Sequence, residues 1–268
     1  MNNLIRYKTS SPSGDLISFL SGIKKVGEDT GKQAIIYHRL NAIGGSYEGA
    51  DSAYEDENKN PIMFNKYCFD MMRPLLLYQD YIEDYIVFEG QEYDVDLDKI
   101  RLEHFTNQPK GSLNRYFNYV FPDMASDLSQ KYLNVRDIKI NGYYDKIILN
   151  FTVRHRNSFI TYFFLKDYQD KLIFAGLKKE RDLFCKEWNL DIPLLEVSDF
   201  LQLAIYINSC KFFMGCQSFV FQLAEALKVP RILELFPMMP NVIPTGSDAY
   251  DAYHEDAIKF YFNKLINK

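Results

Sequence analysis

The feature that most constrains the fold is a regular alternation of short apolar runs with longer, helix-length segments. In the first half, residues 4–8 and 33–38 have the composition of strands, and the segment between them has helical spacing of apolar residues up to Gly31. In the second half, residues 146–150 and 171–174 are short apolar runs of the same kind. Alternation of this type predicts parallel sheets covered by helices. Further strands are expected at 82–88, 93–97, 194–195, 211–214 and 231–235, and further helices at 64–77, 113–121, 124–132, 178–188, 198–207, 219–227 and 253–266.

The length and a gap in this pattern predict two domains. A chain of 268 residues is close to the size at which a single core stops growing. The alternation lapses over residues 134–144, where Asn141 and Gly142 form a turn signal. We therefore expect an N-terminal domain at 1–142 and a C-terminal domain at 143–252, each Rossmann-like, with a last helix at 253–267 that packs back on the first domain. The polar stretch 41–60 is expected to be a mobile loop.

Composition excludes several classes of function. With 31 Lys and Arg against 36 Asp and Glu, the net charge of −5 argues against a nucleic-acid partner. No run of roughly 18 apolar residues predicts a membrane span, and the first residues lack the apolar core of a signal peptide. The four cysteines form no C-x-x-C pair, so we expect reduced thiols in a cytoplasmic protein without a zinc site.

The loop Gly215-Cys216-Gln217-Ser218 follows a predicted strand and precedes a predicted helix. Gly215 would allow a tight turn, and Ser218 would cap the helix that begins near Phe219. The free amides of that helix form an anion site that would suit a diphosphate. A plain helix cap without a ligand explains the same residues and stays open as an alternative.

A second loop, residues 150–157, directly follows the first strand of the same domain and contains Arg154, Arg156 and Asn157. Two arginines beside an amide offer forked donors for phosphate oxygens, although a solvated surface would also account for them. Glu225, seven residues after Ser218, could accept hydrogen bonds from ribose hydroxyls, or could simply face solvent.

The segment from Gly215 to Pro230 resembles the nucleotide-binding segment of GT-B glycosyltransferases, and in particular of the bacterial heptosyltransferases of glycosyltransferase family 9. That family has a strand, a Gly-x-Asp-Ser/Thr-Gly loop and a helix ending in Ala-x-Gly-Val-Pro. The resemblance implies that Gly215, Gln217, Ser218, Phe219, Gln222 and Glu225 contact the donor, with help from Arg154, Arg156 and Asn157. The segment 233–246 is similar to the family's loop after the next strand.

The N-terminal half carries a matching feature. Residues 13–20, which include Gly14 and Asp15, resemble the Gly-Asp-x-x-x-x-Leu-Pro segment that opens those enzymes. The resemblance implies that Asp15 is the base that deprotonates the acceptor hydroxyl, whereas capping and the helix dipole alone would also favour an aspartate there. This sequence departs from the family at Gln217, Phe219 and Gln222, and Ser21 stands where the family has proline.

These observations predict an α/β protein of GT-B fold, with two parallel sheets facing each other across a cleft. The expected activity is transfer of a sugar from a nucleotide diphosphate to a hydroxyl of a glycan, a lipid-linked or a small-molecule acceptor. The reaction is expected to be inverting and to need no cofactor or metal; Asp94-Val95-Asp96 has metal-site spacing but falls in a predicted strand. The location is expected to be cytoplasmic, free or at the inner face of a membrane. Two alternatives stay open: a nucleotide-sugar binder without transferase activity, and a sugar-nucleotide epimerase.

Overall fold

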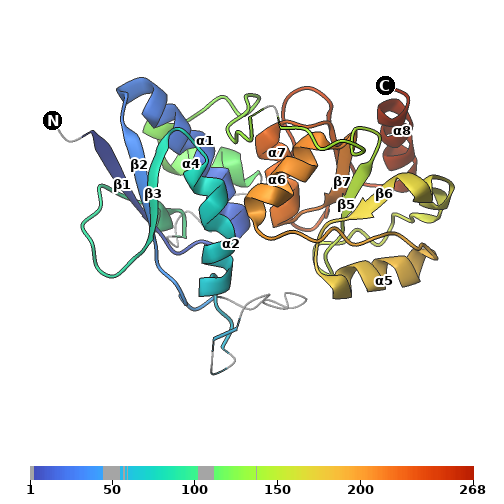
Figure 1. Cartoon of the computed structure of the whole chain (residues 1–268), viewed down its shortest axis with the longest axis horizontal. Coiled ribbons are helices and arrows are strands. Elements are labelled where there is room, and N and C mark those ends of the chain that lie inside the picture. The colour runs from blue at the N-terminus through green and yellow to red at the C-terminus, as the bar shows by residue number, and fades with distance from the viewer. Residues whose placement is uncertain (1–2, 45–54, 57, 59, 102–111, 137) are drawn as a thin grey trace.

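The structure is a computed structural model that describes residues 3–44, 55–56, 58, 60–101, 112–136 and 138–268. Much of the loop predicted at 41–60 lies outside these residues. The described part of the chain contains two parallel sheets side by side, with helices between them and on the outer face of the second sheet (Figure 1). This confirms the α/β class predicted from the alternating pattern.

The N-terminal sheet has the strand order β3-β2-β1-β4. The predicted strands at the start of the chain are confirmed, and the helix between them ends at Gly31, which adopts the left-handed conformation with φ 68°. The strand expected at 93–97 is reduced to two residues and runs into a 3-10 helix. The elements are β1 Leu4–Thr9, α1 Ser13–Thr30, β2 Gln33–His38, α2 Lys66–Leu77, β3 Ile82–Val87, β4 Val95–Asp96, the 3-10 helix η1 Leu97–Arg101, α4 Leu113–Val120 and the 3-10 helix η2 Pro122–Met124.

The C-terminal sheet has the strand order β6-β5-β7-β8-β9, and a parallel bridge joins Leu194 to the edge at β6. The last strand, β9, is not predicted by the sequence pattern, because its four residues Ala249–Ala252 do not show a regular alternation of apolar and polar side chains. The elements are β5 Ile147–Asn150, the 3-10 helix η3 Phe163–Lys171, β6 Leu172–Phe174, α5 Lys178–Trp188, α6 Phe200–Ser209, β7 Phe212–Cys216, α7 Phe219–Leu227, β8 Arg231–Glu234, β9 Ala249–Ala252 and α8 Glu255–Ile266.

The helix predicted at 124–132 is wrong. Only η2 is helical there, and the chain then turns at Asp127, whose carboxylate accepts a hydrogen bond from the Ser129 amide at 2.9 Å. The amides of Tyr132 and Leu133 both donate to the carbonyl of Ala226 at 3.2 Å. This tertiary contact with the end of α7 replaces the hydrogen bonds that a local helix would have made.

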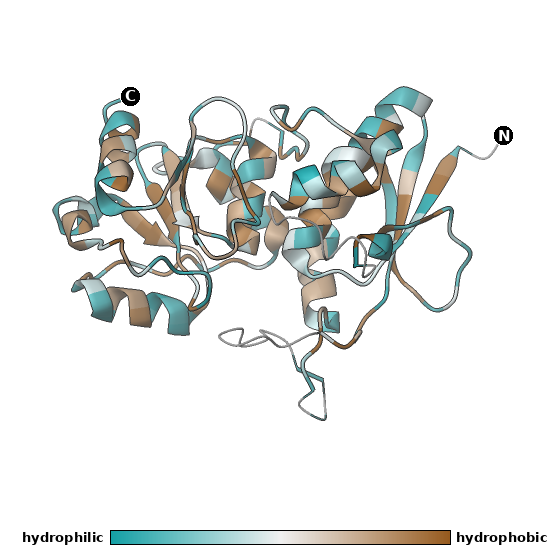
Figure 2. Ribbon diagram, turned by 180° about the vertical axis from the view of Figure 1, so that it is seen from behind, coloured by the Kyte–Doolittle hydropathy of each residue, from teal (hydrophilic) through white to brown (hydrophobic). Residues whose placement is uncertain are grey.

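The two halves meet through helices that share one hydrophobic core. In this core α1 packs against α7, and α2 packs against α6. Figure 2 shows hydrophobic ribbon concentrated in the strands and in these central helices. Apolar burial contributes about 25 cal/mol per Å² removed from water, so this continuous core favours a fixed pairing of the two sheets.

A second core fills the outer face of the C-terminal sheet. It contains the apolar side of α5 and that of α8, including Ile258, Phe262 and Leu265. The final helix therefore packs on the C-terminal half and not on the N-terminal half, which corrects the packing expected from the sequence. The boundary at 142/143 lies between the two sheets, in a stretch without regular elements, and stays a prediction.

A buried histidine lies at the carboxyl end of the N-terminal sheet. His38 is fully buried, its ring stacks on Phe64 at 4.0 Å between centroids, and its Nδ1 is 2.7 Å from the Tyr85 hydroxyl. Burial lowers the pKa of His38 from 6.5 to about 3, because the charged imidazolium would lose its hydration.

We therefore expect His38 to cause an acid destabilisation. As pH falls from 6.5 towards 3, the unfolded chain binds a proton at this residue before the folded chain does, so the free energy of unfolding falls by up to about 1.4 kcal/mol per pH unit from this group. Urea unfolding at a series of pH values should show a shallower dependence for His38→Phe. Tyr85→Phe, which keeps the buried imidazole, should retain the dependence; an identical slope in His38→Phe and wild type would contradict the assignment.

Candidate functional site

The carboxyl ends of β5 and β7 lie side by side, with Asn150 paired to Gly215. The Ser218 hydroxyl accepts a hydrogen bond from the Phe221 amide at 3.1 Å, which confirms the predicted helix cap of α7. The same hydroxyl donates to Asn150 Oδ1 at 2.6 Å. This hydrogen bond fixes the capping serine, and with it the start of α7, next to the carboxyl end of β5.

Gly215 has a different role from the one expected. It belongs to β7 and does not adopt a positive φ. A Cβ at this position would be 2.3 Å from the carbonyl oxygen of Asn150, a backbone atom. The glycine is required because β5 and β7 approach each other closely here, and not because the chain turns tightly.

The start of α1 lies against the start of α7. A Cβ on Gly14 would be 3.7 Å from Cα of Phe219 and 3.8 Å from Cγ of Gln222. Gln222 is buried, and its Oε1 has no hydrogen-bond partner among the described residues. The sequence-predicted residues Gly14, Asp15, Ser218, Phe219 and Gln222 therefore converge from two halves of the chain at two adjacent helix N-termini, whose partial positive charges add at this point.

Asp15 lies in the first turn of α1 and forms an ion pair with Arg101, with its Oδ2 2.5 Å from Nη2 of the arginine. The carboxylate side chain is 25% exposed. Its burial raises the pKa of Asp15, while the charges of Arg101 and then Arg154 lower it. The net direction is upward, so Asp15 is a stronger base than an exposed aspartate.

Arg154 extends from the loop after β5 to this same corner. Its charge lowers the pKa of Asp15 and also that of Glu180, a carboxylate whose pKa burial raises overall. Among the described residues none forms a hydrogen bond with the Arg154 guanidinium, although its backbone carbonyl accepts one from Thr152 Oγ1 at 2.9 Å. Arg154 is thus a cation close to both halves whose donors are available to a ligand.

Arg156 is differently placed from Arg154. Its Nε donates to the fully buried Glu234 at 2.9 Å, and its guanidinium lies over the Phe151 ring, 4.9 Å from the centroid. The ion pair offsets much of its charge. Both arginines are predicted to donate to phosphate oxygens; in the structure Arg156 is paired with Glu234, and Arg154 is not.

Two further residues predicted to contact the donor nucleotide, Asn157 and Gln217, are buried and make internal hydrogen bonds. Asn157 donates through Nδ2 to the carbonyl of Tyr253 at 2.7 Å and accepts from the Phe159 amide at 3.0 Å. Gln217 donates to the carbonyl of Met239 at 2.8 Å and accepts from the Phe236 amide at 3.0 Å. Both side chains therefore hold loops in place, and their contact with a donor nucleotide stays a prediction.

Glu225 also has a structural role. It is buried, and its carboxylate forms ion pairs with Lys228 and, at 2.6 Å, with the fully buried Arg231. The Thr245 hydroxyl lies within hydrogen-bond distance both of this carboxylate, at 2.8 Å, and of the carbonyl of Leu128. The expected contact with a ribose is not supported, because the oxygens are already occupied. The network instead ties α7 to the segment that follows η2.

Three residues of the corner were missed by sequence reasoning. Asn150 orients Ser218, Arg101 pairs with Asp15, and Glu180 lies near Arg154. A polar residue at a strand end was a signal for Asn150, and a glutamate in the first turn of a helix, whose Oε2 accepts from the Leu177 amide at 3.0 Å, was one for Glu180. Arg101 is separated from Asp15 by 86 positions, and no sequence signal links the two.

The remaining expectations concern metals, thiols and membranes. Asp94 accepts a hydrogen bond from the Arg6 amide at 2.8 Å, and Asp96 pairs with Lys8 at 3.2 Å. In the described ranges, no group of three His, Cys, Asp or Glu side chains is arranged to hold a metal ion. The four cysteines are buried free thiols. No helix in the described part of the chain has the length and apolarity that crossing a bilayer requires.

Comparison with solved structures identifies the fold. The Escherichia coli heptosyltransferase WaaC with ADP-2-deoxy-2-fluoro heptose superimposes with a TM-score of 0.61 at 10% identity, covering 97% of this chain and 99% of that one. A family 9 glycosyl transferase from Veillonella parvula gives 0.58 at 10% identity (100% and 91% covered), and the E. coli ADP-heptose lipopolysaccharide heptosyltransferase II gives 0.58 at 15% identity (98% of each). No protein-family model and no curated protein sequence matches the chain. The fold is GT-B, as the sequence resemblance predicted.

The ion pair between Arg101 and Asp15 leads to a test of the electrostatics of this corner. Replacing Arg101 with Gln removes the nearest cation, so the pKa of the Asp15 carboxyl should rise above its wild-type value. Carbon-13 NMR titration of aspartate carboxyls, with Asp15→Asn to assign the signal, measures this directly. Arg101→Lys keeps the charge and should keep most of the effect. A titration unchanged in Arg101→Gln would contradict the ion pair.

Proposed function

We propose that this protein is a glycosyltransferase that moves a sugar from a nucleotide diphosphate to a hydroxyl acceptor. The observation that carries the proposal is the convergence of two helix N-termini from opposite halves. One supplies Asp15, and the other supplies Ser218 and the amides of α7, with Arg154 nearby. The shared GT-B fold supports the proposal, since the similar structures named above are transferases.

The C-terminal half would bind the diphosphate. The amides of Phe219 and Val220 in the first turn of α7 have no intrahelical acceptor, and the helix dipole favours an anion there. Arg154 adds a full positive charge with unoccupied donors. As the bond between the sugar and the diphosphate breaks, negative charge develops on the leaving oxygen, and these groups would stabilise it without reorganising.

The N-terminal half would activate the acceptor. Asp15 takes the proton of the acceptor hydroxyl while the oxygen attacks the anomeric carbon and the bond to the diphosphate breaks. Burial raises the pKa of Asp15, which makes its carboxylate a stronger base than that of an exposed aspartate. A single displacement of this kind inverts the anomeric centre. The charge on the diphosphate is offset by the protein's own cation and dipole, so the proposed step uses no metal.

The proposal also names a class of donor and a class of acceptor. The similar E. coli structure contains an ADP-heptose analogue, so ADP-sugars are the first donors to test. The acceptor is a glycan, a lipid-linked or a small-molecule hydroxyl compound. We propose a cytoplasmic location, with the protein at the inner face of a membrane when the acceptor is lipid-linked; the four free, buried thiols agree with a reducing compartment.

The second candidate is a nucleotide-sugar binder without transferase activity. It is favoured by the structural use of Gln217 and by Gln222, which places a neutral amide beside α1. An epimerase has less support. The charged groups described at the corner are two carboxylates and two arginines, namely Asp15, Glu180, Arg101 and Arg154. His155 is the only histidine in the loop after β5. Donor turnover distinguishes a transferase from a binder.

Substitutions at Asp15 and Arg154 should affect different steps. Asp15→Asn removes the base and should lower kcat by about 100-fold or more, with little change in nucleotide affinity. Arg154→Ala removes a charged donor and should weaken ADP binding by roughly 10-fold, as charge-assisted hydrogen bonds contribute about 1.5–3 kcal/mol. Sugar transfer is measured by release of nucleoside diphosphate, and affinity by calorimetry.

The matched control is Arg73→Ala, which removes an exposed arginine of α2 paired with Asp84 on β3. It should change neither step. Equal turnover in wild type and Asp15→Asn would remove Asp15 from the mechanism. Nucleotide binding without turnover of any ADP-, UDP-, GDP- or CMP-sugar would favour the binder.

A further inference from the structure

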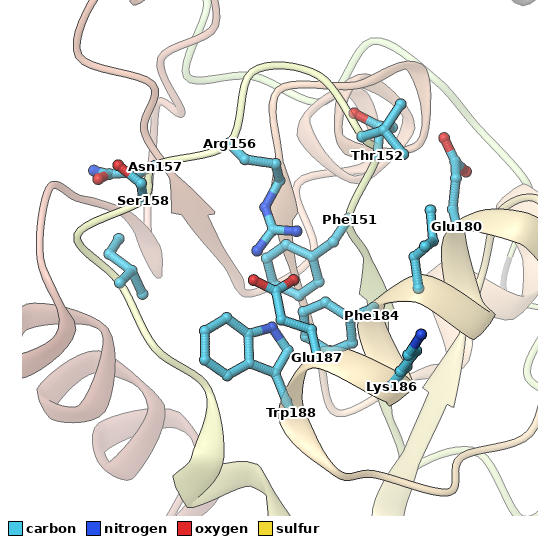
Figure 3. A pocket seen from close by; sticks show the side chains of 13 residues that line it. Phe151, Thr152, Arg156, Asn157, Ser158, Glu180, Phe184, Lys186, Glu187 and Trp188 are labelled. Atoms are coloured by element: carbon cyan, nitrogen blue, oxygen red, sulfur yellow. The ribbon is translucent and has the colours of Figure 1, made fainter.

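A pocket of about 630 Å³ lies in the C-terminal half, between the segment after β5 and the helix α5 (Figure 3). It is on the face of the sheet covered by α5 and α8, away from the junction with the N-terminal half. The crossover from β5 to β6 contains the 3-10 helix η3 in place of an α-helix. Leu183 on α5 is 46% exposed and Val153 on the opposite wall is 48% exposed.

The floor of the pocket is aromatic and ordered. Phe151 and Phe184 stack with centroids 4.5 Å apart and an interplanar angle of 2°. The guanidinium of Arg156 lies over Phe151 and is held by its ion pair with Glu234. Arg156 therefore presents a flat, fixed cationic surface to the pocket. Guanidinium planes of this kind stack on heteroaromatic rings such as nucleobases.

Polar groups on α5 complete the lining. Trp188 is 8% exposed, and its Nε1 has no hydrogen-bond partner among the described residues. Figure 3 shows this nitrogen on the side of the indole that faces the pocket, and the neighbouring Glu187 also lines the pocket. Glu180 lines the pocket at the other end of the helix. Apolar walls with one unpaired N–H donor and two carboxylate acceptors are suited to a flat ring that carries both acceptors and amino groups.

We propose that this pocket binds a nucleobase, stacked on the Arg156 guanidinium and flanked by Val153 and Leu183. Two sources of the ring share this chemistry. It is the base of the donor nucleotide, in which case the inference rests on the proposed function, or it is a separate nucleoside ligand. Glu180 and Thr152 line the pocket and also border the corner of Arg154, so a diphosphate there and a base in the pocket would be neighbours.

Trp188 is the only tryptophan of the chain, so its fluorescence reports on the pocket directly. The probes are adenosine, guanosine, cytidine and uridine, their 5′-diphosphates, and inorganic diphosphate. At least one base should change the emission of the wild-type protein, as nucleoside, as nucleotide or as both. Inorganic diphosphate, which has no ring, should leave the emission unchanged even if it binds near Arg154.

Two variants test the location. Leu183→Arg and Val153→Arg fill the pocket from opposite walls with exposed side chains, and each should weaken binding of the base by about 10-fold or more, since base stacking contributes about 1–3 kcal/mol. Leu77→Arg, at a position on α2 with 36% exposure, is the matched control and should have no effect. Thermal melts of the three variants check that the fold is retained.

The comparison of nucleosides with nucleoside diphosphates, in the wild type and in Arg154→Ala, distinguishes the two sources of the ring. If Arg154→Ala weakens the diphosphates but not the nucleosides, the base belongs to the donor. If nucleosides and diphosphates bind equally and Arg154→Ala changes neither, the ligand is a separate nucleoside. The inference is overturned if no base changes the emission, or if Leu183→Arg and Val153→Arg leave the change intact. Diphosphate binding that depends on Arg154 would survive that result, so the proposed function is tested separately.

Discussion

The packing of α1 on α7 is the contact on which the rest of the molecule depends. The helix α1 follows β1, and α7 follows β7, the central strand of its sheet. A continuous apolar core joins the two helices. Gly14 allows the two N-termini to approach, because its missing side chain leaves room for Phe219 and Gln222. Two partial positive charges then lie together, and Asp15 lies in the first turn of one of the two helices. A single substitution at this contact would disturb both the core and the charges at the corner.

The electrostatics of the corner depend on the partial burial of the Asp15 carboxylate. Asp15 is removed from water enough for its pKa to rise, but Arg101 and Arg154 counter part of that rise. Ion pairs in exposed positions contribute little, whereas a half-buried carboxylate depends on its cations. Arg101 comes from the same half as Asp15, and Arg154 from the other. A ligand that engages Arg154 would therefore alter the environment of the carboxylate, and Arg101 would remain beside it.

The corner and the nucleobase pocket divide the loop after β5 between them. Arg154 faces the junction of the two halves, and Arg156, two positions later, turns to the outer face of the sheet and joins the aromatic floor. Glu234 makes this division possible, since its buried carboxylate accepts from Arg156, from the Asn157 amide and from the Tyr162 hydroxyl. Buried carboxylates of this kind are stable only when their oxygens are fully paired.

The sequence by itself determined the alternating elements, the two parallel sheets, the Ser218 cap and the place of Asp15 in a first helical turn, because these depend on local periodicity and capping. It did not determine β9, the irregular chain after η2 or the packing of α8, since these depend on contacts between distant segments. Nor could it separate Arg154, with donors available, from Arg156, Asn157, Gln217 and Glu225, whose groups are occupied. Whether a polar side chain has an internal partner is set by tertiary packing, because burial makes an unpaired group costly and the partner can come from any part of the chain.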